Sequence, residues 1–243
     1  MIDITMTATR RPEILNRTLS SFRERLFGAK RDLRLIINID PVGHEECTTD
    51  DVLRVCEMYF DRVVHRAPDK PSFPRAFHWA WSTAETETIF HLEEDWELLR
   101  TFDLDLMNYS VQTVPFAHLR LSQWKSEARL KNWKWFLEYD KENCAFMIPK
   151  DVTGTIGFCG HPSLNHRDFI KTCVEHMDPD RNPEKQIKWR NKALWEKVGH
   201  MNFGVFQHPH EPAAVRDTGR KWMIKHGWAK AGNKEHFITW EKK

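Results

Sequence analysis

Apolar and polar residues follow a repeating order over the first part of the chain, up to residue 99. Short apolar runs predict strands, and longer stretches with apolar residues three or four apart predict helices. The predicted elements are, in order, a strand at 2–8, a helix at 13–26, a strand at 33–40, a helix at 49–60, a strand at 62–66, a loop entering a helix at 71–84, and a strand at 88–92. Because strand and helix alternate, we expect an α/β fold with a mostly parallel central sheet flanked by helices.

The remainder of the chain is less regular. Its pattern predicts strands at 116–124, 143–149 and 203–208, a glycine-containing loop leading into a helix at 154–170, and a helix at 183–198. No linker marks a boundary, so we expect a single domain over 1–243, with a regular half at 1–99 and an irregular half at 100–243. Pro41 to Gly43 are expected to end the second strand.

Polar residues gather where the predicted parallel strands end. Residues 7–11 follow the first strand, Asp40 closes the second, and Glu93, Glu94 and Asp95 follow the fourth. Ligands of open parallel sheets bind outside the carboxyl ends of the strands. These residues are therefore expected to converge on one edge of the sheet.

Composition places the chain among ordinary globular proteins, with 40% apolar and 30% charged residues in 243. No run approaches eighteen apolar residues, and the first residues do not resemble a secretory signal, so no membrane span is expected. Five cysteines are scattered without paired spacing, which favours free thiols and a cytoplasmic location.

The two parts of the chain differ in charge. Residues 1–115 carry 14 Lys and Arg against 20 Asp and Glu, a net −6, whereas residues 116–243 carry 23 against 15, a net +8. A basic second part favours contact with an anion such as a phosphate-bearing donor or a nucleic acid. A solvated lysine-rich surface explains the same charge equally well.

Three consecutive acids at a rigid strand end suit a hard divalent cation. Mg²⁺ or Mn²⁺ is commonly held by one or two carboxylates and completed by substrate phosphates. A solvated charged turn is the alternative interpretation of Glu93 to Asp95.

The order of these motifs resembles the nucleotide-sugar-binding half of a GT-A fold glycosyltransferase, close to the large family-two group. Residues 9–15 (TRRPEIL) resemble the family's first helix start, "INID" ends in Asp40 as the nucleoside-binding Asp would, and the helix after Pro74 carries Arg75. "LEEDW" stands where the family has its Asp-x-Asp motif. The resemblance covers about the first 40% of the chain, and its departures are Glu-Glu-Asp for Asp-x-Asp and Asp-Pro-Val-Gly for the usual Asp-Gly-Ser.

The resemblance implies roles for the acidic motif. Asp95 is expected to bind the metal directly, Glu94 to be a second metal ligand, and Glu93 to face the ribose or the metal. Other donor-binding residues implied at the strand ends are Thr7, Thr9, Arg11, Asp40 and Arg75.

The second half supplies the remaining candidates under this resemblance. Inverting GT-A enzymes place a base at the start of a late helix, which implies Glu184, with Asp178 and Asp180 as rivals and a helix-dipole carboxylate as the alternative role. A late histidine often completes the metal site, which implies His208. Further residues are Arg216, Arg220 and Lys221 for the pyrophosphate, Gly157 and Gly160 for close approach of a ligand, and His161 and His166 as pocket groups.

The predicted activity is therefore metal-dependent transfer of a sugar from a nucleotide-diphosphate sugar, expected to be a UDP-sugar, to a hydroxyl acceptor. The compact build also resembles phage-type enzymes that glycosylate hydroxymethylated bases in DNA, and the basic second half with the Trp- and Lys-containing segment 123–136 would suit such an acceptor. The alternatives are a nucleotidyltransferase, against which the glycine-free "TATRRP" argues, and a non-catalytic nucleic-acid-binding module.

Overall fold

A computed structural model describes residues 1–28, 32–123, 137–231 and 239–242. Most of the segment 123–136 singled out above lies outside the described residues. The first elements are β1 (Ile2–Arg10), α1 (Pro12–Phe22), the π-helix η1 (Arg23–Phe27), β2 (Leu33–Gly43), α2 (Thr49–Glu57), β3 (Val63–Arg66), α3 (Phe73–Thr83), β4 (Thr88–Glu93) and β5 (Trp96–Leu98). The later ones are α4 (Leu104–Thr113), β6 (Phe116–Leu121), β7 (Glu138–Asp140), β8 (Ala145–Met147), α6 (Lys150–Ile156), β9 (Ser163–His166), α7 (Arg167–His176), α8 (Pro183–Lys185), the π-helix η2 (Gln186–Arg190), α9 (Lys192–Val198), β10 (Asn202–Phe206), β11 (Val215–Asp217), α10 (Gly219–Lys225), β12 (Trp228–Ala231) and β13 (Thr239–Lys242).

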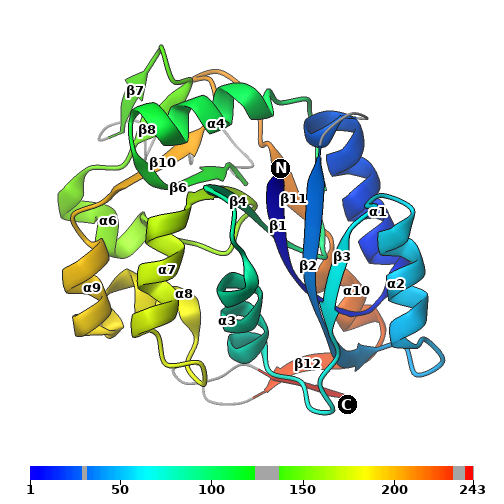
Figure 1. Cartoon of the computed structure of the whole chain (residues 1–243). Coiled ribbons are helices and arrows are strands. Elements are labelled where there is room, and N and C mark those ends of the chain that lie inside the picture. Colours follow the sequence, from blue (N-terminus) through cyan, green and yellow to red (C-terminus); the bar gives the residue numbers. More distant parts are fainter. Residues whose placement is uncertain (29–31, 124–136, 232–238, 243) are drawn as a thin grey trace.

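One large sheet organises the molecule (Figure 1). Over the described residues it has nine strands in the order β3-β2-β1-β4-β9-β6-β10-β8-β7. Strands β3, β2, β1 and β4 are parallel neighbours, β10 is parallel to β6, and β9 and β8 run opposite to the others. The predicted α/β fold with a mostly parallel central sheet is confirmed.

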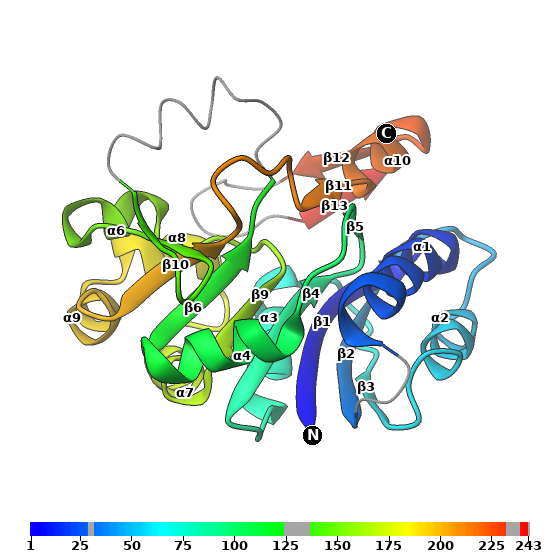
Figure 2. The same ribbon diagram turned by 90° about the horizontal axis from the view of Figure 1, so that it is seen from above.

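Helices cover both faces of the sheet, as Figures 1 and 2 show. The largest apolar cluster joins the sheet to α1, α2 and α4 and includes Leu19, Val52 and Met107. A second cluster joins the other face to α3, α7 and α9 and is built around Trp81 and Phe169. Burial of these two faces is the main favourable term that holds the layers together.

The strands predicted in the first half are confirmed, and some of them are longer than predicted: β1 continues past residue 8 to Arg10, and β2 is also extended. β2 continues through Pro41 to Gly43 instead of ending before them. Its outer neighbour β3 pairs only with Leu35 to Asn38, so Pro41 does not remove a hydrogen bond from an inner ladder. The extension keeps Asp40 within the strand, opposite Thr9 of β1.

The second half departs further from the predicted elements. The predicted loop at the start of 154–170 contains the end of α6 and the antiparallel strand β9, which inserts between β4 and β6. Alternation did not reveal β9 because its polar residues Ser163 and Asn165 are fully buried. The predicted helix over 183–198 is broken, and Asn191 caps a separate helix by accepting a hydrogen bond from the Leu194 amide at 3.1 Å.

The end of the chain returns to the first half. β11 pairs with β5, α10 packs against α1, and the β12–β13 hairpin lies next to α10, as seen from above in Figure 2. Trp222 of α10 donates a 2.6 Å hydrogen bond to Glu13 of α1 and stacks on His226 at 4.0 Å. This return brings α10 to the carboxyl edge of the parallel strands.

Candidate active site

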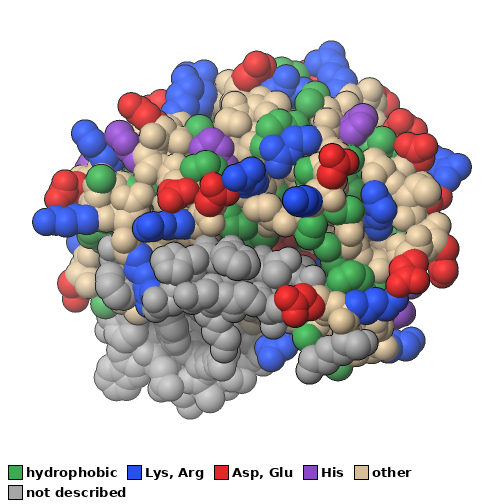
Figure 3. Space-filling model, turned by 90° about the horizontal axis from the view of Figure 1, so that it is seen from below, with side chains coloured by type: hydrophobic (Ala, Val, Ile, Leu, Met, Phe, Trp, Pro, Cys, Tyr) green, Lys and Arg blue, Asp and Glu red, His purple; other side chains and the backbone are tan. Residues whose placement is uncertain are grey.

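The candidate site lies where β1, β2 and β4 end. Thr9 is the partner of Asp40 across β1 and β2, and Thr7 is the partner of Glu93 across β1 and β4. Residues that are far apart in the sequence thus meet on one edge, as the parallel pattern predicts. Figure 3 looks toward this edge from below and shows cationic and anionic side chains interspersed over the face.

Glu94 is enclosed by donors from the end of β1. Its carboxylate accepts hydrogen bonds from the Thr9 amide at 2.8 Å, from the Thr9 hydroxyl at 2.7 Å, and from Arg11 Nε and Nη2 at 3.0 and 2.5 Å. Its backbone oxygen also accepts a hydrogen bond from Thr18. This geometry makes Glu94 a link between the β1 turn and the β4 turn, and a metal-binding role for it stays a prediction.

Burial and neighbouring charges have opposite effects on the pKa values of Glu94 and Arg11. Burial raises the pKa of Glu94, whereas Arg11 and Thr9 lower it; the pKa of Arg11 is raised by the two neighbouring acids despite its own burial. The net shift of the Glu94 pKa is upward, because burial and the neighbouring Asp95 outweigh Arg11 and Thr9, although the hydrogen bonds from Thr9 and Arg11 favour the ionised form. The Nη1 atom of Arg11 is buried and makes no hydrogen bond within the described residues.

Asp95 lies between Arg11 and the start of α10. Its Oδ2 atom is 3.3 Å from Arg11 Nη2, and its backbone oxygen accepts hydrogen bonds from the amide and hydroxyl of Thr218 at 2.8 and 2.9 Å. A Cβ atom on Gly219 would lie 1.9 Å from Asp95 Oδ2, so only glycine lets the carboxylate occupy this place. Thr218 and Gly219 were not predicted as site residues, because their position depends on the return of α10.

The charge of Asp95 also responds to its surroundings. Burial raises its pKa, Arg11 lowers it, and the carboxylate of Asp217 raises it again, leaving the pKa above the ordinary value. The Asp95 carboxylate is thus attracted by Arg11 and repelled by Asp217 at the same time.

Glu93 meets the candidate base Glu184 across Gly160. A Cβ on Gly160 would lie 2.7 Å from Glu93 Oε1 and 3.4 Å from Glu184 Oε1. Glu184 Oε1 also accepts a 2.6 Å hydrogen bond from the Gly160 amide. The structure therefore brings a residue of the predicted donor site and the predicted base, 91 positions apart in the numbering, to the same point on the rim.

Two aromatic rings close this part of the rim. Trp96 and His161 pack edge to face, with ring centroids 4.9 Å apart. Trp96 Nε1 and His161 Nδ1 are buried and have no hydrogen-bond partner in the described part of the chain. Burial, aided by Arg120, lowers the pKa of His161 to about 4, so its ring is neutral at pH 7. His166, by contrast, pairs with Thr88 at the start of β4, on the opposite edge of the sheet.

Asp40 is fixed on the other side of β1. Its carboxylate accepts hydrogen bonds from Asn38 Nδ2 at 2.8 Å and from the Ser72 amide at 3.0 Å. Arg66 donates to Asn38 Oδ1 at 2.8 Å and lies 5.1 Å from the centroid of Trp79. Burial raises the pKa of Asp40 against the lowering by Asn38, Ser72 and Arg66. The Asp40 carboxyl is thus held in place by groups that donate to it.

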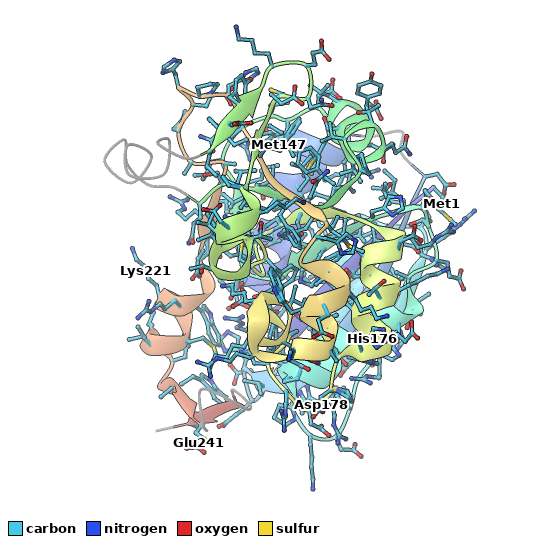
Figure 4. The ribbon with its side chains drawn as sticks, turned by 90° about the vertical axis from the view of Figure 1, so that its left-hand side faces the viewer. Met1, Met147, His176, Asp178, Lys221 and Glu241 are labelled. Carbon is cyan, nitrogen blue, oxygen red and sulfur yellow. The ribbon has the colours of Figure 1, made fainter. Side chains whose placement is uncertain are left out.

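The remaining predicted residues are more dispersed. Arg75 forms an exposed bidentate pair with Asp180 at 2.5 and 3.1 Å, and Arg216 pairs with Glu97 at 2.5 Å. Arg220 and Lys221 are exposed at the start of α10, where Figure 4 shows Lys221 on the outer side of the molecule.

His208 lies at the β7–β8 edge of the sheet. Its Nδ1 atom is 2.8 Å from the hydroxyl of Tyr139, and its Nε2 atom is 3.0 Å from the thiol of Cys144. No contact with Asp95 accompanies these, so the pairing of His208 with the acidic motif stays a prediction.

A divalent cation needs oxygen or nitrogen ligands from nearby side chains. Within the described residues no cluster of three or more His, Cys, Asp or Glu side chains could enclose an ion. Mg²⁺ and Mn²⁺ bound with a nucleotide need only one or two carboxylates, the phosphates supplying other ligands. Asp95, just after the end of β4, is a carboxylate of this kind, and its role as a metal ligand stays a prediction.

Comparisons with known proteins give the fold. No protein-family model and no curated protein matches the sequence. Solved structures do match: S. aureus TarS with a TM-score of 0.59 and 8% identity, over 90% of this chain and 37% of that one, and S. aureus TarS 1-349 in complex with UDP with a TM-score of 0.56 and 9% identity, over 87% and 59%. TarS 1-349 in complex with UDP-GlcNAc matches with a TM-score of 0.52 and 11% identity, over 88% and 57%.

The chain thus spans between about a third and three-fifths of these neighbours. No helix among the described residues is both long and apolar enough to cross a membrane. With its parallel strands, its acidic β4 end and these structural neighbours, the chain has a GT-A-like glycosyltransferase fold.

Proposed function

We propose that the protein is a metal-dependent glycosyltransferase that moves a sugar from a UDP-sugar to a hydroxyl acceptor. The observation that carries this proposal is the meeting of Glu93, the last residue of β4, with Glu184 at Gly160. A fold whose neighbours bind UDP and UDP-GlcNAc supports the choice of donor.

Each side chain then has a defined task. Asp40 would hold the nucleoside, with Arg66 beside it, and Asp95 with Glu93 would hold Mn²⁺ or Mg²⁺, which when bound neutralises the diphosphate. Glu184 would take the proton of the acceptor hydroxyl as its oxygen bonds to the sugar carbon that the diphosphate leaves. One Glu184 oxygen accepts a hydrogen bond from the Gly160 amide, and the other would accept the proton.

Transfer of labelled sugar from UDP-sugars to a panel of hydroxyl acceptors tests this proposal. We expect Glu184→Gln to lower the rate by about 10²- to 10⁴-fold, the range of general base catalysis, while leaving UDP binding intact. Asp178→Asn is the matched control, because Asp178 is the rival base and lies just before α8. Full activity in Glu184→Gln, or a loss confined to Asp178→Asn, would contradict the role given to Glu184.

We also propose DNA that carries hydroxymethylated bases as a candidate acceptor, on the basis of the net +8 of residues 116–243. Transfer should then occur to a hydroxymethylated duplex and not to an unmodified duplex of the same sequence. Transfer to small hydroxyl compounds but to neither duplex would reject the DNA acceptor and retain the glycosyltransferase.

A further inference from the structure

Cys159 lies on the loop between α6 and β9, one residue before Gly160, and is partly exposed. Its sulfur accepts a hydrogen bond from Arg120 Nη1 at 3.2 Å. Arg120 is buried on β6 and is fixed by further hydrogen bonds to the backbone oxygens of Ile156 at 2.7 Å and Gly157 at 3.1 Å. A fixed positive charge therefore touches the thiol, and a guanidinium can only donate to it.

A histidine lies on the other side of the same thiol. His118 precedes Arg120 by two residues on β6, so both side chains leave the same face of the strand. The His118 ring is fully buried and lies beside Cys159, where each group shifts the pKa of the other. Burial lowers the pKa of His118, so the ring is neutral.

The buried amide of Asn165 fixes which ring nitrogen carries the proton. Asn165 Nδ2 donates to the backbone oxygens of Ile89 and Ser163 at 3.3 and 3.2 Å, which leaves Asn165 Oδ1 facing His118 Nδ1 at 2.7 Å. An amide oxygen only accepts, so Nδ1 bears the hydrogen and Nε2 has a free lone pair. Nε2 is buried and makes no hydrogen bond within the described residues, which leaves it free to take a proton.

The charged groups around Cys159 act in opposite directions. Burial and the nearby Glu184 raise the pKa of the thiol, whereas Arg120 and His118 lower it, and the net shift is below the ordinary value. Cys47 is also partly exposed, but burial and the acids Asp51, Glu13 and Glu46 raise its pKa. Cys159 and Cys47, both partly exposed residues, thus lie in opposite electrostatic settings.

We propose that Cys159 is an activated nucleophilic thiol, a modification site for soft electrophiles and peroxides, served by His118 as base, Asn165 as its orienting group and Arg120 as the stabiliser of the thiolate. With an alkyl iodide, the thiol proton passes to His118 Nε2, the sulfur bonds to carbon, and iodide leaves. With hydrogen peroxide, the thiolate attacks one oxygen, the O–O bond breaks, and the leaving hydroxide takes the proton from His118 to give water and a sulfenic acid.

Modification of Cys159 would affect the candidate site through the backbone of Gly160. Cys159 is bonded to Gly160, whose amide holds Glu184. An adduct on the sulfur is therefore expected to displace Glu184 and slow sugar transfer; this consequence alone rests on the proposed function.

Limiting iodoacetamide on the native protein at pH 7, followed by peptide mapping, tests the thiol without any measurement of sugar transfer. We expect Cys159 to be labelled about five- to tenfold faster than Cys47, because a larger fraction of it is thiolate. Labelling of Cys159 and Cys47 in the urea-unfolded protein is the control, and there the ratio of their labelling rates should fall to about one. A native ratio at or below one would overturn the proposal.

A His118 variant distinguishes two causes of fast Cys159 labelling, namely proton removal by His118 and solvent exposure of the thiol. His118→Gln should bring the Cys159 rate down toward that of Cys47, provided that its unfolding midpoint shows a folded protein. An unchanged Cys159 labelling rate in folded His118→Gln would reject His118 as the base. If this variant does not fold, the ratio of Cys159 to Cys47 labelling rates in the native wild-type protein decides the proposal. Dimedone labelling after hydrogen peroxide should mark Cys159 and not Cys47.

Discussion

A single buried carboxylate holds together three segments at the start of the sheet. Asp3 on β1 is fully buried and accepts two 2.8 Å hydrogen bonds from Arg34 of β2, together with the amides of Glu85 at 2.7 Å and Thr86 at 3.1 Å. Arg34 and these amides lower the pKa of Asp3 against the opposing effect of burial. The ionised form is thus the form that the folded chain stabilises.

Asp3→Asn is expected to lower the free energy of unfolding by about 3 kcal/mol at pH 7, as loss of one partner of a buried pair does. Because the folded pKa is depressed, the contribution of Asp3 is complete above its unfolded pKa and disappears as the pH falls through the folded value. Urea unfolding of both proteins from pH 7 to pH 3 should therefore show a difference that narrows below about pH 4.

Asp32→Asn serves as the control for that measurement. Asp32 is 57% exposed and forms longer contacts, at 3.6 Å with Arg62 and 3.9 Å with the N-terminus, so its loss should change stability by less than about 1 kcal/mol. An Asp3→Asn deficit that stays constant down to pH 3 would contradict the ionised role of Asp3.

Sequence patterns located the acidic residues of the site but not their separate environments. Glu93, Glu94 and Asp95 are adjacent, yet one faces Gly160, one is enclosed by Thr9 and Arg11, and one lies against α10. Those differences arise from residues 67 or more positions away in the chain, and local periodicity carries no information about them. The activated setting of Cys159 depends on β6 in the same way.

Among the elements that the sequence pattern did not predict, α10 and β9 matter most for the site. The elements of the first half could be predicted because parallel strands and the helices that cover them have clear hydrophobic periods. The position of the start of α10 could not be predicted, because tertiary contacts fix it. Thr218 bonds to the backbone of Asp95, and Gly219 lies against the Asp95 side chain. The position of Asp95 thus depends on a helix more than 120 residues later in the chain.

Gly219→Ala tests that dependence. The new Cβ would overlap Asp95, with 1.9 Å to Oδ2 and 2.6 Å to Cβ, so the carboxylate or α10 must move. We expect at least about a tenfold loss of UDP-sugar transfer and a lower melting temperature. Lys225→Ala, an exposed change in the last turn of the same helix, should leave both unchanged. Wild-type transfer by Gly219→Ala would show that Asp95 need not stay where α10 holds it.

In the whole molecule, the last part of the chain contacts the first part at one edge of the sheet. β11 pairs with β5, Trp222 bonds to Glu13, and Lys242 pairs with Glu45, so the acidic first part and the basic second part meet there. Under the proposed function, a nucleotide diphosphate would bind at this edge together with a cation held by Asp95 and Glu93. The proposed function thus requires, before any single contact, that the donor binds at this edge.

Thermal unfolding with UDP, GDP and their sugars, each with and without Mn²⁺, tests that claim most directly. We predict that UDP or a UDP-sugar with Mn²⁺ raises the melting temperature of the wild-type protein by several degrees, since a ligand at a hundred times its Kd adds about 2.7 kcal/mol to the stability of the folded state. The rise should be smaller without Mn²⁺ and should be lost in Asp95→Asn. An unchanged melting temperature with every nucleotide diphosphate, in the presence and absence of Mn²⁺, would contradict the account.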